Sequence, residues 1–291
     1  MRVLILGGGG MLGHKLVQRF QRDFDTWTTL RGEPAAMARY GFYDPAKVVP
    51  GVDVEAFGSV EAAVRRVRPD AIVNCVGIIK QLAGAKDPML SLTINAMLPH
   101  RLHRLAVESG SRLIHISTDC VFNGRKGRYT EDDQSDAEDL YGRTKFLGET
   151  AGPGALTLRT SIVGRELATA SGLVEWFLSQ RGGRVQGYTR AIYTGFTTEA
   201  LARILRSVLT DHPGLHGMLQ VSSEPIDKDA LLRLMNAAYG AGVEIVPSDA
   251  VRIDRSLDSS RFRALTGFQP PSWTDMVAEM AADPTPYDAW H

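Results

Sequence analysis

The stretch Gly7-Gly8-Gly9-Gly10-Met11-Leu12-Gly13 decides the fold of this chain. It follows the apolar run Val3–Leu6 and opens the segment Met11–Arg22, which has the periodicity of a helix. The patterns G-x-G-x-x-G and G-x-x-G-x-x-G overlap in it. Glycines allow positive φ angles and close backbone approach, and the N-terminus of a helix presents N–H groups to phosphate. A strand, a glycine turn and a helix in this order predict a dinucleotide-binding unit.

Strands and helices keep alternating through the first half of the chain. Apolar runs typical of strands occur at Trp27–Leu30, Ala71–Val76, Arg112–Ser117 and Leu156–Leu158, and helical periodicity occurs at Ser59–Val67, Met89–Ser109 and Leu140–Thr150. Ser59 is expected to cap the first of these helices. Strands that are apolar on both faces and separated by helices indicate a parallel sheet covered on both sides. We therefore predict an α/β, Rossmann-type, doubly wound fold.

The alternation of predicted strands and helices becomes less regular in the second half of the chain. Helices are expected at Leu173–Gln180, Thr198–Leu209, Lys228–Tyr239 and Trp273–Ala281, with short β-like pieces at Gly183–Gln186 and Gly217–Val221. This change predicts a dinucleotide-binding Rossmann domain over residues 1–163 and a smaller, mostly helical substrate-binding lobe over residues 164–291. Interleaving of the chain between these two parts is left open.

Composition excludes several classes of protein. The 33 basic and 33 acidic residues give a formal net charge of zero, whereas a dedicated nucleic-acid binder usually carries a basic surplus. Two cysteines cannot form a disulfide framework or a four-cysteine zinc site, so no metal site is predicted. The apolar runs are too short to span a membrane. We expect a cytoplasmic protein without nucleic-acid or membrane partners, and homo-oligomerisation is left open.

The end of the second predicted strand favours NADP(H) over NAD(H). NAD-binding proteins place an acidic residue here to bind the ribose hydroxyls. This chain has Arg31 instead, and Glu33 comes two residues too late. A guanidinium suits the 2′-phosphate of NADP(H). NAD(H) stays open, because Arg31 as a solvated loop residue is the alternative interpretation.

The pattern Y-x-x-x-K occurs twice, and context separates the copies. Tyr43–Lys47 contains Pro45, so a helix is not expected to run through it. Tyr141 and Lys145 begin a helical stretch, where positions i and i+4 share a face. An ammonium beside a tyrosine favours the phenolate and lowers the tyrosine pKa from about 10. Such a tyrosine is suited to proton transfer near neutral pH.

Hydroxyl groups follow the predicted strand Arg112–Ser117. In an open α/β sheet, ligands bind beyond the carboxyl ends of the strands. Thr118 therefore stands where a substrate held against the dinucleotide would lie. Its hydroxyl is suited to hold a carbonyl oxygen.

Together these motifs resemble the extended short-chain dehydrogenases/reductases, and among them the dTDP-4-dehydrorhamnose reductase branch. The matching stretches are the glycine turn, Val52-Asp53-Val54, Val73–Gly77, Ile94-Asn95, Ser117–Gly124, Tyr141–Lys145 and Leu158–Ser161. The resemblance covers nearly the whole chain, but its specific motifs lie in the first 161 residues.

The resemblance implies a role for each matching residue. Gly7, Gly10, Met11 and Leu12 would line the pyrophosphate, Asp53 and Val54 would flank the adenine, and Cys75, Val76 and Gly77 would lie beside the adenosine ribose. Asn95 would lie on the helix under the site and contribute to cofactor binding. Thr118, Tyr141 and Lys145 would form the catalytic group, and Tyr141 and Lys145 would also contact the cofactor.

The implied activity is NAD(P)H-dependent reduction of a nucleotide-linked 4-keto-6-deoxy sugar. The nicotinamide would supply the hydride and Tyr141 the proton, and the partner would be a nucleotide-diphosphate sugar. Lys80, Gln81 and Arg190 follow strand-like segments and are candidates for binding the sugar diphosphate. Ordinary surface positions explain these three residues equally well.

Two departures from the family pattern bear on the substrate. Cys75-Val76-Gly77 replaces a run of alanines, and Cys120 stands where this branch usually has tyrosine. Related 4,6-dehydratases place Asp-Glu after the threonine as an acid and base pair, so Asp119-Cys120 disfavours dehydration. A nucleotide-sugar epimerase that holds NAD tightly remains an alternative. A non-catalytic subunit resembling the regulatory β subunit of methionine adenosyltransferase is the alternative from another class.

Overall fold

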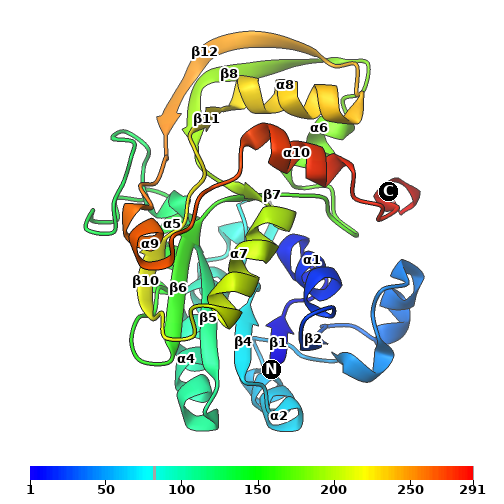
Figure 1. Ribbon diagram of the computed structural model, residues 1–291, viewed down its shortest axis with the longest axis vertical. Coiled ribbons are helices and arrows are strands. Elements are labelled where there is room, and N and C mark those ends of the chain that lie inside the picture. The colour runs from blue at the N-terminus through cyan, green and yellow to red at the C-terminus, as the bar shows by residue number, and fades with distance from the viewer. Residues whose placement is uncertain (81–82, 291) are drawn as a thin grey trace. The chain divides into compact units, whose positions relative to one another are not determined.

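The computed structural model describes residues 1–80 and 83–290, and its main feature is a seven-stranded sheet (Figure 1). The strands are β1 (Arg2–Leu6), β2 (Asp25–Thr29), β3 (Val48–Val49), β4 (Ala71–Asn74), β5 (Arg112–Thr118), β6 (Ala155–Thr160) and β10 (Gly217–Gln220). Their order is β10-β6-β5-β4-β1-β2-β3. β1 pairs in parallel with both β2 and β4, so the strand order reverses beside β1, where Rossmann-type folds bind their ligands. The predicted doubly wound fold is confirmed.

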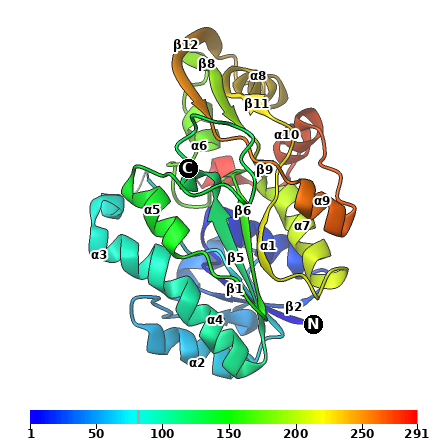
Figure 2. The same cartoon turned by 90° about the vertical axis from the view of Figure 1, so that its left-hand side faces the viewer.

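Helices cover both faces of this sheet. α2 (Phe57–Val67), α4 (Leu98–Ser109) and α5 (Leu140–Leu147) lie on one side and α1 (Met11–Phe20) lies on the other (Figure 2). Val60 and Val64 of α2 and Leu102 of α4 are buried in one cluster with Leu4 and Ile72 of the sheet. Full burial of each such side chain contributes about 1.5–3 kcal/mol. Packing therefore fixes the strand ends from which the site residues project.

The chain forms two compact units whose segments interleave. The first unit comprises residues 1–117, 139–158 and 204–218, and the second comprises residues 118–138, 159–203 and 219–291. Elements in or entering the second unit are α6 (Leu173–Leu178), α7 (Thr198–Thr210), α8 (Lys228–Tyr239), α9 (Ser260–Thr266), α10 (Trp273–Ala281), β7 (Ile162–Val163), β8 (Arg184–Tyr193), β9 (Phe196–Thr197), β11 (Ile226–Asp227) and β12 (Glu244–Asp254). A three-stranded sheet in this unit has the order β11-β8-β12.

Strands in the second half extend further than the sequence indicated. The piece expected at Gly183–Gln186 is the start of the ten-residue strand β8. β12 was not expected, because residues 244–254 are mostly exposed and their register against β8 shifts between Ser248 and Arg252. The piece expected at Gly217–Val221 forms β10, an edge strand of the main sheet.

The expected helix cap at Ser59 is wrong. α2 begins earlier, at Phe57, and its N-cap residue Ala56 makes no side-chain capping bond. The Ser59 hydroxyl instead donates to the Asp53 carbonyl at 2.8 Å and accepts from the Asp53 N–H at 3.0 Å. Ser59 therefore closes the loop before α2 rather than starting the helix.

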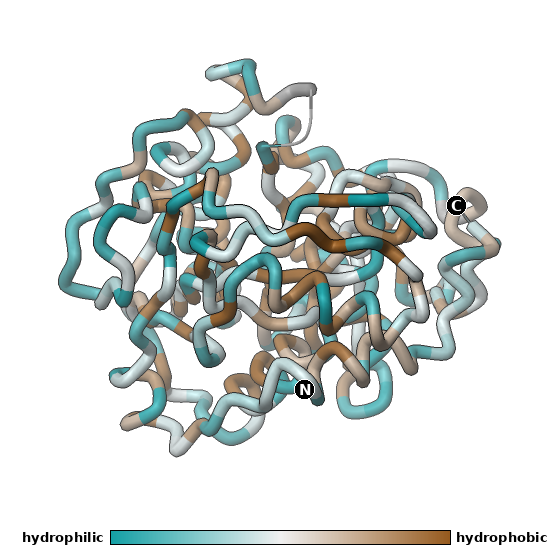
Figure 3. Tube along the Cα trace, turned by 90° about the horizontal axis from the view of Figure 1, so that it is seen from above, coloured by the Kyte–Doolittle hydropathy of each residue, from teal (hydrophilic) through white to brown (hydrophobic). Residues whose placement is uncertain are grey.

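Shorter helices complete the fold. They are α3 (Pro88–Ser91), the π-helical turn η4 (Leu92–Met97) and the short helices η1 (Pro34–Tyr40), η2 (Pro45–Lys47), η3 (Ala83–Lys86), η5 (Asp119–Val121) and η6 (Tyr287–Ala289). Figure 3 shows hydrophilic stretches mainly along the outer loops of the trace. None of the helices in the described part of the chain combines the length and the hydropathy needed to cross a membrane.

Candidate active site

The glycine turn after β1 has a geometry that only glycine satisfies. Gly7 has a φ of +82°, and its carbonyl accepts the Gly10 N–H at 3.1 Å. A Cβ atom at Gly13 would collide with this same carbonyl oxygen, and one at Gly8 would collide with the Thr28 hydroxyl. The glycines therefore let β1, β2 and α1 meet at van der Waals distance.

The start of α1 fits a pyrophosphate. Gly10 is the N-cap residue and supplies no side-chain hydrogen bond, so within the described residues the first-turn N–H groups of Met11 and Leu12 have no side-chain cap. A Cβ atom at Gly10 would have only the Gly7 carbonyl oxygen within 4 Å, at 3.5 Å. Open space before uncapped N–H groups is the arrangement that binds phosphate.

The end of β4 lies against the glycine turn. A Cβ atom at Gly7 would come within 2.9 Å of the Val76 side chain, and the Cys75 N–H donates to the Leu6 carbonyl at 3.1 Å. Burial raises the pKa of the Cys75 thiol to about 12. The thiol is therefore protonated at neutral pH and serves as an apolar wall rather than as a nucleophile.

Arg31 and Asp53 occur at the same edge of the sheet. The Leu30 N–H donates to the Val49 carbonyl and the Leu30 carbonyl accepts the Val52 N–H, both at 3.0 Å. Arg31 directly follows Leu30 and Asp53 directly follows Val52, so both lie next to this second hydrogen bond. Arg31 is exposed. Both residues predicted at the adenosine end are thus brought together at the edge beyond β2.

The other Y-x-x-x-K copy does not form a Tyr–Lys pair, but its tyrosine supports the glycine turn. Lys47 binds Asp25, whereas the Tyr43 hydroxyl donates to the Gly8 carbonyl at 2.8 Å. No helix runs through the whole of Tyr43–Lys47, as expected, although the short helix η2 begins at Pro45. The structure therefore gives Tyr43 a contact that the sequence pattern did not predict.

Tyr43→Phe is expected to weaken NADPH binding by a few fold, because an ordinary hydrogen bond contributes about 1 kcal/mol. The kcat value should not change, since the hydrogen bond that the hydroxyl makes among the described residues is to the turn. Fluorescence titration with NADPH measures the first effect, and steady-state kinetics measures the second. An unchanged Kd would show that Tyr43 does not help to shape the turn.

Helix α5 presents the second Tyr–Lys pair, and its N-terminus is anchored by Asp139. The Asp139 carboxylate accepts the Gly142 N–H at 2.8 Å and the Lys80 ammonium at 2.6 Å. The same Lys80 nitrogen lies 5.6 Å from the centre of the Tyr141 ring. The structure thus brings the predicted Lys80 beside Tyr141, while Gln81 lies outside the described residues.

Lys145 connects α5 to the strand that ends in Thr118. Its side chain is only 5% exposed, and its ammonium donates to the Ile116 carbonyl at 2.7 Å. Burial lowers the Lys145 pKa to about 8, although Glu149 acts in the opposite direction. Tyr141 lies one turn earlier on the same face of the helix.

Asn95 holds α5 to the loop after β4. Its Oδ1 atom accepts the Ile78 N–H at 2.9 Å, and its Nδ2 atom donates to the Ile78 carbonyl at 3.1 Å and to Thr144 Oγ1 at 3.3 Å. Asn95 lies in the π-helical turn η4, a feature found often at functional sites. The sequence indicated its place under the site but not this turn.

His115 was not singled out from the sequence, because a lone histidine in an apolar strand carries no distinctive pattern. The Asn74 Oδ1 atom accepts the Val76 N–H at 3.1 Å, so its Nδ2 atom must donate to His115 Nδ1, also at 3.1 Å. The ring proton therefore resides on His115 Nε2. Burial and nearby Lys145 lower the His115 pKa well below 6.5, so the ring stays neutral. His115 thus fixes the loop that carries Val76.

Thr118 belongs to the second unit, where it starts a buried polar turn. Its hydroxyl accepts the Cys120 N–H at 3.1 Å and donates to the Asp119 carboxylate at 3.1 Å. Burial raises the Asp119 pKa, and the charges of Arg255 and Lys228 oppose this effect. The threonine oxygen is therefore held in one position by its own turn.

Arg190 lies on β8 and is exposed. The register of the parallel pair places Arg252 of β12 directly opposite it. Like charges opposite each other on neighbouring strands are destabilising unless an anion binds between them. Arg252 is thus a second arginine at this position, which the sequence did not indicate.

The model of the RmlD substrate binding domain matches residues 1–209. The chain belongs to this family. A probable dTDP-4,6-dihydroxy-2-methyloxan-3-one 4-ketoreductase of Streptomyces antibioticus is 29% identical over 240 residues, 77% of this chain and 72% of that protein. A dTDP-4-dehydrorhamnose reductase of Mycobacterium tuberculosis is 26% identical over 309 residues, 97% of this chain and 93% of that protein.

A solved structure of the same enzyme type shows the same fold. The dTDP-4-dehydrorhamnose reductase of Bacillus anthracis, crystallised in complex with NADP, gives a TM-score of 0.77 at 20% identity. The match covers 96% of this chain and 98% of that chain. In this member of the RmlD family, the predicted site residues of the first unit are the glycine turn, Arg31, Asp53, Val54, Cys75–Gly77, Lys80, Asn95, Tyr141 and Lys145, and those of the second unit are Thr118 and Arg190.

Proposed function

We propose that the protein is an NADPH-dependent reductase of a nucleotide-linked 4-keto-6-deoxy sugar, similar in activity to dTDP-4-dehydrorhamnose reductase. One observation carries this proposal. The buried Lys145 ammonium binds the Ile116 carbonyl, two residues before Thr118, and Tyr141 lies one turn away on α5. Membership of the RmlD substrate binding domain family and the curated reductases among its relatives support it.

The cofactor proposed is NADP(H), with NAD(H) as the weaker alternative. Gly7, Gly10, Met11 and Leu12 would hold the pyrophosphate, because the α1 N-terminus offers uncapped N–H groups there. Arg31 would bind the 2′-phosphate, and Asp53 and Val54 would flank the adenine. Cys75, Val76, Gly77 and Asn95 would form the wall beside the ribose. When bound, the nicotinamide supplies the hydride that reduces the ketone carbon.

Protein groups carry the rest of the reaction. Tyr141 transfers its phenolic proton to the sugar oxygen as negative charge develops on that oxygen, and the ketone becomes an alcohol. Lys145 keeps a positive charge beside Tyr141 and holds the nicotinamide ribose. Thr118 orients the carbonyl through its hydroxyl, which would donate its single proton to the sugar oxygen in place of Asp119. Tyr141 and Lys145 share one helix, which reduces the entropic cost of bringing these two groups together.

The substrate is proposed to bind with its diphosphate near Arg190. Arg252 lies opposite it in the strand register, so two guanidinium groups can share one diphosphate. Lys80 remains a candidate for a substrate contact because its ammonium lies beside the Tyr141 ring. Residues 164–291 are proposed as the main substrate-binding part, and the cytoplasm as the compartment in which two cysteines stay reduced.

A coupled assay tests this function. Nucleotide-linked 4-keto sugars are generated in situ by a 4,6-dehydratase, and NADPH oxidation is followed by absorbance with each sugar. We expect turnover with at least one 6-deoxy sugar. Sugar interconversion without net NADPH oxidation would favour the epimerase alternative. Absence of both reactions, with an unrelated subunit copurifying, would favour the regulatory-subunit alternative.

Arg31→Ala is expected to reduce the preference for NADPH over NADH by roughly tenfold, because one charge-assisted contact is lost. The affinity for NADH should change little. Calorimetric Kd values for both dinucleotides measure this effect, and exposed Arg22→Ala serves as the matched control. Equal affinities for the two dinucleotides in the unmodified protein would contradict the proposed role of Arg31.

A further inference from the structure

Lys228 lies beside the turn that begins at Thr118. It is the first residue of α8, and its ammonium lies 4.5 Å from the centre of the Tyr193 ring. Its charge interacts with Asp119 and with Cys120, the two residues that follow Thr118. All of these residues belong to the second unit. An amine from a distant part of the chain therefore lies near the two residues that follow the threonine expected to hold the substrate carbonyl.

The Lys228 ammonium lacks an acceptor in the part of the chain that the structure describes. The two fully buried lysines each have one: Lys15 donates to Gln18 at 2.8 Å and Lys145 donates to Ile116 at 2.7 Å. For Lys228, the aromatic face of Tyr193 and the charge of Asp119 compensate the positive charge in part. The Lys228 side chain is partly exposed, so its hydrogen-bond donors are open to water or to a ligand.

Tyr193 gives a second, independent sign of a ligand. Its side chain is 6% exposed, and within the described residues its buried hydroxyl finds no hydrogen-bond partner. Burial raises the pKa of the Tyr193 hydroxyl, and the charge of Asp119 acts in the same direction, so Asp119 lies near this side chain. Buried polar groups are normally satisfied, and exceptions call for an explanation. The buried Tyr193 hydroxyl, which has no partner among the described residues and belongs to a ring centred 4.5 Å from the Lys228 ammonium, indicates a binding site for an oxygen atom.

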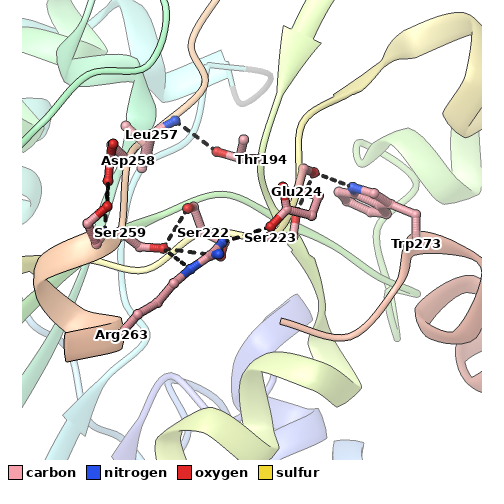
Figure 4. Close-up of polar contacts among 10 residues, drawn as sticks. Thr194, Ser222, Ser223, Glu224, Leu257, Asp258, Ser259, Arg263 and Trp273 are labelled. Carbon is pink, nitrogen blue, oxygen red and sulfur yellow. Dashed lines mark hydrogen bonds and ion pairs between the residues drawn. The ribbon is translucent and has the colours of Figure 1, made fainter. Parts of the chain in front are cut away.

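Figure 4 shows polar contacts of Thr194, the residue after Tyr193, and of Trp273. The Leu257 N–H donates to Thr194 Oγ1 at 3.0 Å, and Trp273 Nε1 donates to the Glu224 carbonyl at 2.7 Å. The Trp273 ring packs against the Tyr193 ring, with centroids 5.3 Å apart. The ring under Lys228 is therefore fixed from two sides.

The charges of Lys228 and Asp119 indicate which part of the substrate, the diphosphate or the sugar, this cluster would bind. Asp119 lies in the same cluster and would repel a diphosphate. A sugar hydroxyl or carbonyl carries no net charge, and an ammonium can donate to its oxygen. The arginines at positions 190 and 252 are available for the diphosphate elsewhere in the unit. The cluster around Lys228 is thus suited to the sugar rather than to the nucleotide.

We propose that Lys228 is a substrate-contacting residue that donates a hydrogen bond to an oxygen atom of the sugar held by Thr118, and that it thereby contributes to sugar selection. This proposal rests on the proposed function. Cys120 stands where the reductase branch usually has tyrosine, and Lys228 interacts with this position. The lysine thus occurs beside the residue at which this chain departs from the family pattern.

The test compares Lys228→Met with Lys228→Arg by calorimetric binding of two probes. The probes are a nucleoside diphosphate and the same nucleotide linked to a 6-deoxy sugar. In the unmodified protein the sugar should tighten binding. Lys228→Met should raise the Kd of the sugar-linked nucleotide by roughly ten- to hundredfold, as expected for the loss of one charged hydrogen bond. The Kd of the nucleoside diphosphate should stay unchanged. Lys228→Arg keeps the charge and should restore part of the gain.

Exposed Lys126, which pairs with Asp133 in the same unit, provides the matched control Lys126→Met. Circular dichroism melting verifies that each variant folds, and Lys228→Arg carries the test if Lys228→Met does not fold. An unchanged sugar contribution in the Lys228 variants would overturn the proposal, as would an equal loss for the nucleoside diphosphate. Failure of the proposed function is seen separately, as absence of NADPH oxidation despite normal binding of both probes.

Discussion

Tyr141→Phe is expected to lower kcat for sugar-ketone reduction by roughly 10²–10⁴-fold, because general acid catalysis contributes about that much. The change removes only the hydroxyl and keeps the ring beside the Lys80 ammonium. The fold should therefore survive, and the Kd for NADPH should change little. Steady-state kinetics on an accepted nucleotide sugar and NADPH titration measure the two effects separately.

The matched control for this variant is Tyr188→Phe. Tyr188 lies on β8 and is partly buried, and no hydrogen bond of its hydroxyl is found within the described residues. The same chemical change at this position should leave kcat unaffected. Full activity of Tyr141→Phe on an accepted substrate would show that another group supplies the proton.

Lys145→Met should lower kcat/KM by about 10²-fold or more and also weaken NADPH binding, because the lysine is assigned to both the tyrosine and the ribose. The pH dependence gives a sharper readout. The ammonium is the functional form, and burial lowers its pKa to about 8. Activity that needs this charge is present below about pH 8 and falls as the pH rises through that value, well before the ordinary lysine range.

The lowered pKa of Lys145 also affects the stability of the protein. The folded protein releases the Lys145 proton at a lower pH than the unfolded chain, so the unfolded chain binds more protons between the two pKa values. The free energy of unfolding should therefore gain a contribution as the pH rises through this window, while activity is lost. Stability and activity should move in opposite directions, which separates loss of the charge from simple unfolding.

Exposed Lys86→Met serves as the control for both measurements and should keep the alkaline fall in kcat/KM. Lys145→Met should remove that fall from its residual activity. A fall that persists unchanged in Lys145→Met would assign it to a different group.

Local patterns were sufficient to predict the first half of the fold. The observed strands and helices there begin or end within a few residues of the predicted ones, because each apolar run is buried on both faces of a parallel sheet. The glycine turn could be predicted because the close contacts that require glycine are between residues near in sequence, such as Gly7 and Gly13.

The second half was harder to predict because its order depends on distant partners. β12 pairs with β8 although its side chains are mostly exposed, so it has no strong hydropathy pattern. The roles of His115 and Tyr43 likewise arise from hydrogen bonds to residues 41 and 35 positions away. Lys228 reaches the Thr118 turn from the start of α8, more than 100 positions along the chain. No spacing rule within the sequence connects such pairs.

Deuterium transfer from the cofactor to the sugar distinguishes a ketoreductase from the epimerase and regulatory-subunit alternatives. The protein is incubated with NADPH deuterated at C4 of the nicotinamide and with a nucleotide-linked 4-keto-6-deoxy sugar, and the product is analysed by mass spectrometry and NMR. We expect deuterium on the former carbonyl carbon with the unmodified protein, and a strongly reduced rate of its appearance with Tyr141→Phe. A sugar that is bound and turned over without incorporating deuterium at that carbon would contradict the assignment of this protein as a ketoreductase.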